Sequence, residues 1–544
     1  MEFEHSGVVQ QEKRSIFKRI SFPLPWIIKT FVITHWLRAP GGAALLLALA
    51  LAASGAPAQT DHLTGNTPDD ADFYNDPLAK GASLYIDSVW SGNSVGFAFL
   101  TLPNLQIAGY YNASRQLVLA ARNLNSTRWY YQTNNTVFGG WDGHNYITMS
   151  LDPLGCLHLS GNMHNQPMTY FRSAQPVMDA AQFQSPGFMR QLSPLWNVAS
   201  EARSTYPSWF TSPNQEFIFS YRNHIQSTVG SWYLLKFSTA TWSFSLATGP
   251  SPLFTWINNY SVYPAFTVCG GYVHCLYMWR GSGDAASNYR LSYLRSSNLL
   301  NWTDAFGRAV TLPISTNASL PIIDDVPQGG GLLNGQPRLG FDRHGVPLVA
   351  YHKYDAAGHS QVYVARPAPG SRSWLIVQLT SAAWSWKFSG GGCLPPGGWV
   401  NNPFVRDDPV AGLSTVAVAM TYANGARDNN DSGNYTFEET TLKSVMRTHS
   451  RPGSHDSDGA PTANNAHVDN NVMQDPYTAP VSGDKMVINR LSSAGVASAG
   501  SHYYLRWEAL RGDNRDKPKM DARGHLIKPT PSALMLCRTR ADRN

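Results

Sequence analysis

Residues Asp152–His164 read DPLGCLHLSGNMH, in which a turn-forming Asp-Pro-Leu-Gly precedes an apolar strand that ends in polar residues. Short apolar runs bounded by such turns favour β-strands. The phrase recurs with its turns near residues 113, 155, 215, 271, 345 and 411, about 40 to 75 residues apart. Irregular spacing of this size indicates propeller blades with variable loops rather than a solenoid, so we predict an all-β protein. The other copies are NASRQLVLAARN (112–123), SPNQEFIFSYRNH (212–224), CGGYVHCLYMWR (269–280), DRHGVPLVAYHKYD (342–355) and, more weakly, PVAGLSTVAVAMTYANG (409–425).

The two ends of the repeat region predict how the fold closes. A seventh unit would combine the C-terminal SHYYLRWEALRGDN (501–514) with the first strands near SLYIDSVWSGNSVGFAFL (83–100). Pairing the two ends would remove the exposed sheet edges. We therefore expect a seven-bladed β-propeller that forms a single domain over residues 59–544. Within it, residues 450–478 are polar and low in complexity, which predicts a disordered insertion.

The N-terminal 58 residues have the pattern of an export signal. The apolar run Ala43–Ala53 follows Lys29 and Arg38, and a small-x-small cleavage pattern ends at Ala58. Eleven apolar residues are too few to cross a membrane, so we read 1–58 as an N-terminal extension with a signal peptide. A membrane-anchored form and a different start codon are the alternatives. We expect a secreted protein without stable membrane association.

Composition narrows the class of protein further. The 544 residues are 43% hydrophobic, which is enough to bury a large core, and 14% charged, well below the roughly 25% typical of soluble domains. This composition indicates a globular rather than a disordered chain. The formal charge of +6 falls to about +3 without residues 1–58, which hold six Lys or Arg and three Glu, and such a charge does not indicate nucleic acid. We expect a monomer. Eight N-x-S/T sequons favour a eukaryotic glycoprotein, namely Asn112, Asn125, Asn134, Asn259, Asn301, Asn317, Asn430 and Asn434.

The five cysteines are too few for a disulfide scaffold and allow two bridges at most. Cys269 and Cys275 flank a possible hairpin, but buried free thiols are the favoured interpretation. All five are Cys156, Cys269, Cys275, Cys393 and Cys537.

The motifs of nucleotide, zinc-protease and serine-hydrolase chemistry are missing in a fitting context. What remains is a set of His, Tyr and Arg residues near strand ends. His144 lies in a loop before one repeat and His164 ends its strand, Tyr206 precedes the next repeat and Arg222 ends its strand, and Tyr263 precedes the one after.

At this point the sequence resembles the propeller-fold polysaccharide lyases with BNR-type repeats, chiefly the ulvan lyases. Nine phrases in order carry the resemblance, from about residue 83 to the C-terminus. They are WDGHNY, LHLSGNMH, TYPSWF, FIFSYRN, VYPAF, YLRSSNLLNW, GLLNGQPRLGFDRHGVPLVAYHKYD, KFSGGG and YYLRWEALRGDNRDKP. The resemblance implies a seven-bladed enzyme that cleaves an acidic polysaccharide, ulvan or a related rhamnose and glucuronate polymer, by β-elimination beside a uronic acid.

The resemblance also implies catalytic residues: His144, His164, Tyr206, Arg222 and, as a weaker match, Tyr263. These types suit the chemistry. Loss of the proton at C5 builds charge on the neighbouring carboxylate, which an arginine fork can bind at two points, while His and Tyr can take and give protons without a metal. His158 lies six residues before His164 and is expected to pack within the blade.

Two more residues are candidates for substrate binding, since Arg280 and His352 sit at strand positions similar to that of Arg222. A salt bridge between blades is the competing role for Arg280. No cofactor is expected to be needed for catalysis, whereas a structural divalent metal ion is compatible with the family. His274, Cys275 and His352 are conceivable ligands, but core packing is favoured for them and we assign no metal site.

Two other functions stay open at this stage. One is a sialidase-like glycoside hydrolase, although no clear Asp-box run S-x-D-x-G-x-T-W occurs in the sequence. The other is a non-catalytic carbohydrate-binding propeller that uses its 17 Trp as sugar platforms.

Overall fold

The computed structural model describes residues 76–538 apart from 79–80, 227–228, 259, 317–320, 392–397, 401–403, 406–411, 421–429, 450–485, 496–501, 511–517, 519, 522 and 528. Residues Asp61–Asn544 form a unit of their own. The predicted signal segment 1–58, the predicted insertion 450–478 and Cys393 lie outside the described residues.

The regular secondary structure of the described residues is almost entirely β-strand, and the strands form seven sheets. Sheet 1 consists of β2 (Ala98–Thr101), β3 (Leu105–Tyr111), β4 (Gln116–Asn123) and β5 (Tyr130–Val137), with β31 (Ala494–Gly495) beside β2. Sheet 2 consists of β6 (Ile147–Leu151), β7 (Leu157–Gly161), β8 (Tyr170–Ser173) and β9 (Met189–Gln191). Sheet 3 consists of β10 (Ser204–Thr211), β11 (Phe217–Gln226), β12 (Val229–Ser238), β13 (Ser243–Leu246) and β14 (Phe254–Ile257).

Sheet 4 consists of β15 (Ser261–Cys269), β16 (Tyr272–Arg280), β17 (Asn288–Ser296), β18 (Trp302–Thr303), β19 (Ala309–Val310) and β20 (Ile322–Asp324). Sheet 5 consists of β21 (Arg338–Phe341), β22 (Pro347–Tyr354), β23 (Ser360–Pro367) and β24 (Trp374–Gln378). Sheet 6 consists of β25 (Gly398–Val400), β26 (Phe404–Val405), β27 (Leu413–Met420), β28 (Gly433–Glu438) and β29 (Ser444–His449). Sheet 7 consists of β1 (Ser83–Val89), β33 (Ser532–Arg538), β32 (Tyr503–Leu510) and β30 (Met486–Ser492). The described helical segments are η1 (Gly143–Asn145), η2 (Ala180–Gln184), α2 (Val198–Glu201) and η3 (Ala285–Ser287).

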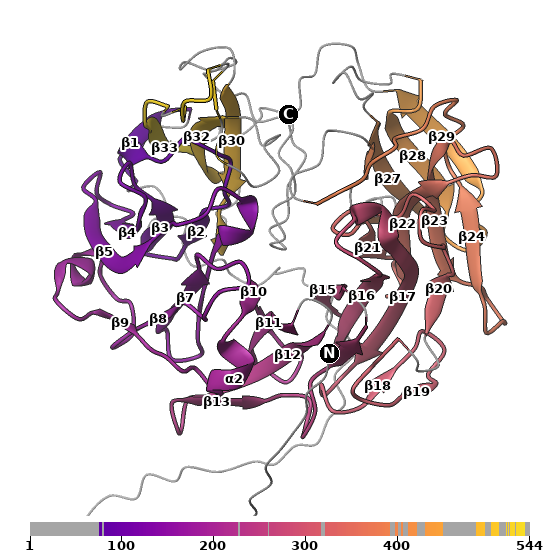
Figure 1. Cartoon of the computed structure of the whole chain (residues 1–544), viewed down its shortest axis with the longest axis horizontal. Helices are drawn as coiled ribbons and strands as arrows, with labels where there is room; N and C mark the ends of the chain where they lie inside the picture. The colour runs from indigo at the N-terminus through magenta and orange to yellow at the C-terminus, as the bar shows by residue number, and fades with distance from the viewer. Residues whose placement is uncertain are drawn as a thin grey trace, which may run out of the picture. The chain divides into compact units, whose positions relative to one another are not determined.

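The sheets follow one another around a common centre (Figure 1), with β2, β10, β15 and β21 toward the middle and β5, β13, β24 and β29 toward the outside. Their cores are continuous from sheet to sheet, because apolar clusters bridge sheets 7, 1 and 2, then 2 and 3, 3 and 4, 4 and 5, and 5 and 6. The prediction of an all-β fold is confirmed.

The predicted pairing of the two chain ends is also found. Strand β1 pairs antiparallel with β33, which in turn pairs with β32 in the predicted C-terminal segment. The structure differs from the prediction in one detail, since only β1 joins these strands. The second N-terminal strand, β2, pairs with β3 in sheet 1 instead.

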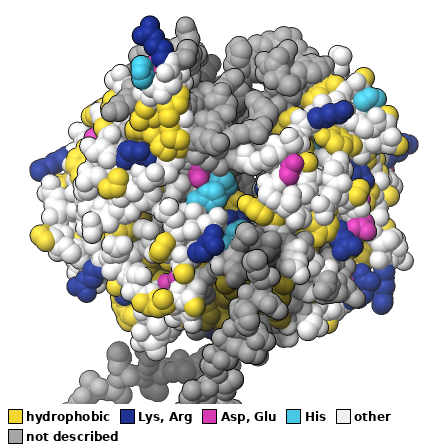
Figure 2. Space-filling model, in the orientation of Figure 1, with side chains coloured by type: hydrophobic (Ala, Val, Ile, Leu, Met, Phe, Trp, Pro, Cys, Tyr) yellow, Lys and Arg dark blue, Asp and Glu magenta, His cyan; other side chains and the backbone are white. Residues whose placement is uncertain are grey.

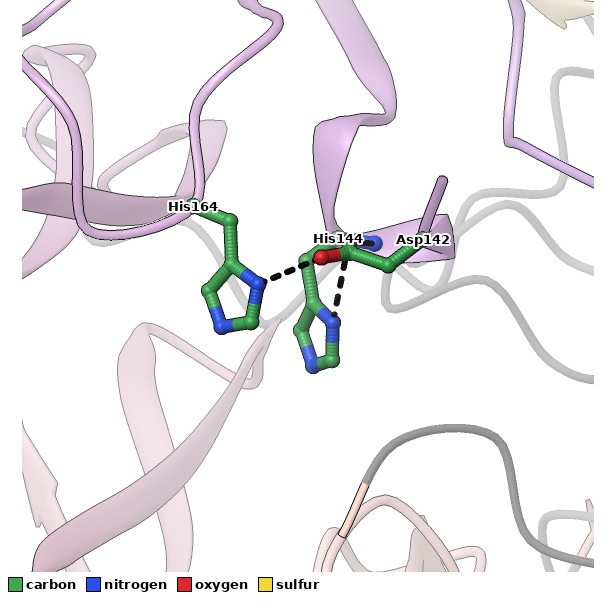
Figure 3. A group of neighbouring side chains, drawn as sticks. All are labelled: Asp142, His144 and His164. Atoms are coloured by element: carbon green, nitrogen blue, oxygen red, sulfur yellow. Dashed lines mark hydrogen bonds and ion pairs between the residues drawn. The ribbon is translucent and has the colours of Figure 1, made fainter. Parts of the chain in front are cut away.

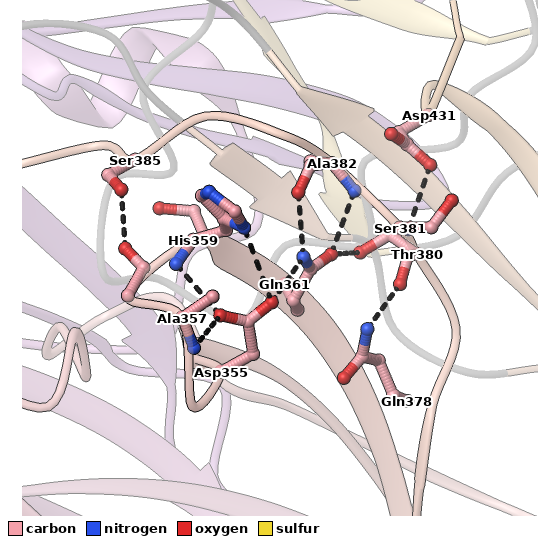
Figure 4. Close-up of polar contacts among 12 residues, drawn as sticks. Asp355, Ala357, His359, Gln361, Gln378, Thr380, Ser381, Ala382, Ser385 and Asp431 are labelled. Atoms are coloured by element: carbon pink, nitrogen blue, oxygen red, sulfur yellow. Dashed lines mark hydrogen bonds and ion pairs between the residues drawn. The ribbon is translucent and has the colours of Figure 1, made fainter.

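The recurring turn has a simple physical basis. In Asp152–Cys156 the Oδ1 atom of Asp152 accepts hydrogen bonds from the backbone N–H of Leu154 (2.8 Å) and Cys156 (2.9 Å), and Gly155 has a φ of 80°. A residue with a side chain rarely adopts that backbone conformation, so glycine occupies the fourth position. The turn that begins at Asp355 has the same pattern (Figure 4).

The first predicted repeat is out of phase with the others. The turn near residue 155 joins the first and second strands of sheet 2, whereas the turn near residue 113 joins the second and third strands of sheet 1, β3 and β4. The sequence pattern cannot distinguish them because both turns precede an apolar strand.

The prediction that Cys269 and Cys275 are free thiols is confirmed, and Cys156 is a free thiol as well. Cys156, Cys275 and Cys537 are buried and Cys269 is partly exposed. Among the described residues, no helix is both long and apolar enough to cross a membrane.

Candidate active site

One edge of sheets 2, 3 and 4 carries the predicted catalytic residues, and strand pairing explains why. In a hairpin the start of the first strand lies opposite the end of the second, and the pairs Thr205↔Arg222 and Ser261↔Arg280 show this arrangement. Tyr206 therefore lies close to Arg222. Figure 2 shows histidine side chains reaching the surface near the middle of one face, with an acidic side chain beside them.

His144 and His164 share one carboxylate, that of Asp142 (Figure 3). His144 lies in η1, for which Asp142 is the N-cap, and its Nδ1 is 3.2 Å from Asp142 Oδ1. The Nδ1 of His164 is 2.6 Å from Asp142 Oδ2. The two imidazole rings stack with their centroids 4.1 Å apart. The sequence predicts that His164 ends its strand. In the structure His164 lies three residues beyond the end of β7.

The shared carboxylate fixes the tautomer of both imidazoles. An ionised carboxylate only accepts hydrogen bonds, so each Nδ1 carries its proton toward Asp142 and each Nε2 keeps a lone pair. Both Nε2 atoms point away from Asp142, in the same direction (Figure 3). Two imidazole nitrogens are thus available to accept a proton side by side.

Electrostatics support an ionised Asp142 and a neutral His164. Burial opposes the ionisation of Asp142, but hydrogen bonds from His144 and His164 outweigh it and hold the pKa of Asp142 well below its usual range. Burial, together with the neighbouring His144 and Arg222, lowers the pKa of His164, although the Asp142 carboxylate raises it. His164 is therefore neutral at neutral pH.

The loop that carries His164 is tied to β10. The backbone N–H of Asn165 donates to Thr205 Oγ1 (2.8 Å), and Thr205 Oγ1 donates to Asn165 Oδ1 (3.2 Å). The η1 side is tied to the same strand, since the Tyr146 hydroxyl donates to the carbonyl of Pro207 (3.0 Å). These bonds fix His144 and His164 relative to the start of β10.

An irregularity in β10 sets the orientation of the Tyr206 side chain. The register with β11 shifts between Thr205 and Ser208, and Tyr206 has a φ of 59°. A left-handed backbone is strained for a bulky residue, and such strain is typical of functional sites. The ring of Tyr206 lies 5.4 Å from His144 and 5.9 Å from Tyr263 between centroids.

The phenol of Tyr206 stays protonated. Burial raises its pKa well above the usual value of 10, Tyr263 acts in the same direction, and the cations of Arg222 and Arg280 oppose the shift. Tyr206 is therefore suited to donate a proton rather than to accept one.

Arg222 is a buried cation beside these groups. The residue is 2% exposed, and its guanidinium lies 4.6 Å from the ring of Tyr206 and 5.9 Å from that of Tyr263. Its Nη1 donates to Ser261 Oγ (3.4 Å) and its Nη2 to Asn165 Oδ1 (3.3 Å). Within the described ranges no carboxylate forms an ion pair with Arg222, and its Nε has no hydrogen-bond partner. An anionic ligand group would supply the missing counter-charge.

Arg280 is committed to its own loop. Its Nε donates to the carbonyls of Ser282 and Asp284 (both 3.1 Å), its Nη2 donates to Gly283, and its Nη1 donates to the Tyr263 hydroxyl (3.3 Å). Arg280 does not form the salt bridge between blades that was the competing prediction, because its partners are backbone carbonyls and a phenol. Arg280 holds Tyr263 in place.

His352 is packed rather than exposed. It is 3% exposed and its ring lies 5.3 Å from Trp386 and 6.4 Å from Phe388 between centroids. None of its described contacts is with the five predicted catalytic residues. The sequence suggested otherwise because the position of His352 in β22 resembles that of Arg222 in β11.

Arg115 braces the loop that carries Asp142. Its guanidinium lies 4.6 Å from the ring of Trp90, 4.9 Å from that of Phe138 and 5.1 Å from that of Trp141, and its Nη2 donates to the carbonyl of Gly140. Arginine stacks well on aromatic faces. The residue before Asp142 is thereby fixed.

Sequence reasoning missed Asp142 and Asn165. Asp142 stands two residues before His144 in WDGHN, and an Asp at that spacing often caps a short helix, which was the available signal. Asn165 follows His164 directly, but no local pattern indicates that it contacts Arg222, which is distant in the sequence.

His158 lies inside the blade, as predicted. It is fully buried, with its Nε2 3.2 Å from Asp152 Oδ2 and its Nδ1 2.9 Å from the hydroxyl of Tyr170. The rings of Phe217 and Phe237 lie 4.8 Å away between centroids.

We expect His158→Ala to lower the free energy of unfolding by about 2 to 4 kcal/mol, because it leaves a cavity and a buried Asp152 carboxylate short of a partner. The variant should keep most of its kcat. Denaturant unfolding and steady-state kinetics measure the two effects, and a folded but inactive variant would contradict the assignment.

Within the part of the chain that the structure describes, one group of side chains could hold a metal ion, namely the cluster around the shared carboxylate. Asp142, His144 and His164 each offer a ligand atom, and these atoms lie within 4.8 Å of one another. Imidazole nitrogens and a carboxylate oxygen are suitable ligands for zinc. His274 has both ring nitrogens engaged, by the Tyr293 hydroxyl (2.5 Å) and the Cys269 carbonyl (3.1 Å). The contacts of His274 therefore support a role in core packing rather than in metal binding.

Buried histidines predict sensitivity to acid. Burial lowers the pKa of His274 and of His352 to about 4 in the fold. Below about pH 6.5 the unfolded chain takes up protons that the folded chain refuses, so the free energy of unfolding should fall by about 1.4 kcal/mol per pH unit for each histidine until pH 4. Denaturant midpoints at pH 7 and pH 5 measure this. A His274→Phe variant should show a flatter profile, and a stability that stays constant between these pH values would refute the prediction.

The fold and the site define a β-propeller-like protein in which two imidazoles, a phenol and a buried guanidinium gather on one edge. Residues 105–382, more than half of the chain, match the BNR repeat-containing family, and the chain belongs to that family. The sequence matches no curated protein.

Three of the solved structures that match this chain are the following. The crystal structure of polysaccharide lyase Uly1 has 11% sequence identity, covers 88% of this chain and 96% of its own, and gives a TM-score of 0.50. An ulvan lyase of polysaccharide lyase family PL25, bound to an oligosaccharide of GlcA and Rha3S, has 12% sequence identity. The match covers 78% of this chain and 93% of the ulvan lyase, with a TM-score of 0.49. An α-L-arabinanase of Penicillium chrysogenum complexed with arabinobiose has 10% sequence identity. The match covers 72% of this chain and 92% of the arabinanase, with a TM-score of 0.34.

Proposed function

We propose that this protein is a lyase that cleaves a uronate-containing acidic polysaccharide, ulvan or a related rhamnose and glucuronate polymer, by β-elimination. The observation that carries the proposal is Arg222, a buried cation without an acidic partner among the described residues, beside two imidazoles and a phenol. A uronate carboxylate has the charge and the planar shape that an arginine fork binds. A solved structure named as a polysaccharide lyase shares the fold, which is consistent with a polysaccharide substrate.

In the proposed reaction each residue has one role. Arg222 binds the carboxylate and stabilises the charge that grows on it as the C5 proton leaves. A neutral imidazole of the pair, His164 in the first instance, accepts that proton at Nε2. The C5–H electrons form the C4–C5 double bond, the C4–O4 bond breaks, and Tyr206 donates its proton to the leaving O4. Tyr263, whose ring lies 5.9 Å from both the ring of Tyr206 and the guanidinium of Arg222, helps to order these two groups.

The finer features of the molecule belong to the same proposal. The seven sheets act as seven blades of a single domain, with the pairing of β1 and β33 supporting closure of the ring. Residues 1–58 direct export and are then removed. The exported protein carries N-linked sugars on some of its sequons and acts as a monomer.

The decisive experiment is to incubate the protein with ulvan and follow ultraviolet absorbance together with reducing ends. An unsaturated uronate absorbs in the ultraviolet, and only elimination produces it. New reducing ends without that absorbance would indicate a hydrolase, and binding without cleavage would indicate a carbohydrate-binding propeller.

We expect a chelator to leave the elimination rate within about twofold, because His164, Tyr206 and Arg222 supply the base, the acid and the cation. The assay compares initial rates before and after dialysis against EDTA, with melting temperature followed in parallel to detect a structural ion. Loss of activity with an unchanged fold, restored by a divalent cation, would mean that a metal takes part.

A further inference from the structure

A pocket lies between sheets 2 and 3, apart from the residues described above. A pocket of about 200 Å³ is lined by Arg172, Ser173, Ala174, Arg190, Leu192 and Trp242. His164 precedes β8, whereas Arg172 and Ser173 end that strand. The pocket shares no residue with the candidate active site.

The pocket contains an unfavourable arrangement of charge. Arg172 in β8 pairs directly with Arg190 in β9 across the two strands. Like charges directly opposite one another in an antiparallel pair destabilise a sheet. Neither arginine forms an ion pair with any carboxylate in the described part of the chain. The fold therefore presents two cations to one pocket without neutralising them.

The third side of the pocket is an aromatic residue held in a strained conformation. Trp242 is 41% exposed and has a φ of 56° at the turn between β12 and β13. A large aromatic residue with a left-handed backbone is unusual and is more typical of a functional position than of a plain turn. The guanidinium of Arg172 lies 4.6 Å from the ring of Trp242, which orients it within the pocket.

From these observations we propose that the Arg172–Arg190–Trp242 pocket is a non-catalytic binding site for an anionic sugar residue. The two guanidinium groups bind a sulfate ester or a carboxylate, and the exposed indole packs against the sugar ring. The inference rests on the proposed function for the class of polysaccharide. The pocket holds a second stretch of the same polysaccharide molecule while the active site binds the first stretch. A long polymer therefore binds more tightly than a short fragment.

The test measures the binding of long and short ulvan fragments to protein variants. Every variant, and the reference protein, carries Asp142→Asn so that cleavage is slow. We expect the double variant Arg172→Gln with Arg190→Gln to raise the dissociation constant for the long polymer about tenfold and to leave that for the shortest fragment unchanged. Trp242→Ala should weaken polymer binding in the same direction. The matched control is Arg128→Gln, which removes another exposed arginine stacked on an aromatic ring, Tyr130.

Polymer binding that is unchanged in the double variant would overturn the proposal, and so would equal weakening by Arg128→Gln, because the effect would then be general attraction between charges. Desulfated ulvan identifies the anion, since binding that depends on the pocket disappears if sulfate is the group and persists if the carboxylate is. The proposed lyase function can fail separately. In that case the polymer still binds through the pocket, but the protein without Asp142→Asn forms no unsaturated uronate.

Discussion

Asparagine in place of Asp142 is expected to lower kcat about a thousandfold while leaving the fold intact. The side chain of Asn has one acceptor and one donor group, so it can accept a hydrogen bond from the Nδ1–H of only one of the two imidazoles. The other imidazole, either His144 or His164, must then turn its Nδ1 lone pair toward the amide and carry its proton on Nε2. That nitrogen can no longer act as a base.

The substitution also predicts a change in pH dependence that a purely structural defect would not cause. The Asp142 carboxylate raises the pKa of His164, while burial lowers it. Without that carboxylate the pKa of His164 falls further, so the acidic limb of kcat/KM should move to lower pH. The cap of η1 should survive because Asn is a good N-cap residue.

Asp152→Asn is the matched control, since Asp152 and His158 form a similar pair in the core of the blade. That variant should lose stability but keep its kcat. If Asp142→Asn stays within threefold of the wild-type kcat, Asp142 does not position the imidazoles.

The sequence predicts those parts of the fold that depend on local chemistry. Each Asp-x-x-Gly turn marks the start of a strand, because one carboxylate can accept two backbone N–H bonds only when a left-handed residue follows. The phase of the repeat is not local. The turn at residue 113 looks like the others, and only the pairing of β2 with β3 assigns it to a different strand connection.

The site follows the same division. The residues His144, His164, Tyr206, Arg222 and Tyr263 were predicted in advance, and the structure brings them together through shared contacts. Asp142 and Asn165 were missed because their role is to accept hydrogen bonds from residues on other elements. The strand positions of Arg280 and His352 resemble that of Arg222 but do not determine their contacts, which are loop carbonyls and a phenol for Arg280 and aromatic rings for His352. Their role in substrate binding stays a prediction.

Lysine in place of Arg222 is expected to lower kcat about a hundredfold, equivalent to about 3 kcal/mol of transition-state stabilisation. The substitution keeps the positive charge but loses the planar fork, which donates to Ser261 and Asn165 and stacks on Tyr206. An ammonium group cannot bind both oxygens of a uronate carboxylate while filling that space. Because the charge on the carboxylate grows as the C5 proton leaves, the loss should appear mainly in kcat, with a smaller rise in KM.

The control for Arg222→Lys is Arg280→Lys, which changes a second buried arginine near Tyr263. The donors of Arg280 go to the backbone carbonyls of Ser282, Gly283 and Asp284, so its loss should reduce stability more than kcat. Steady-state kinetics on ulvan and denaturant unfolding of both variants separate the two effects. A near wild-type kcat for Arg222→Lys would remove this residue from the mechanism, and a larger kcat loss in Arg280→Lys would place the carboxylate beside Arg280 instead.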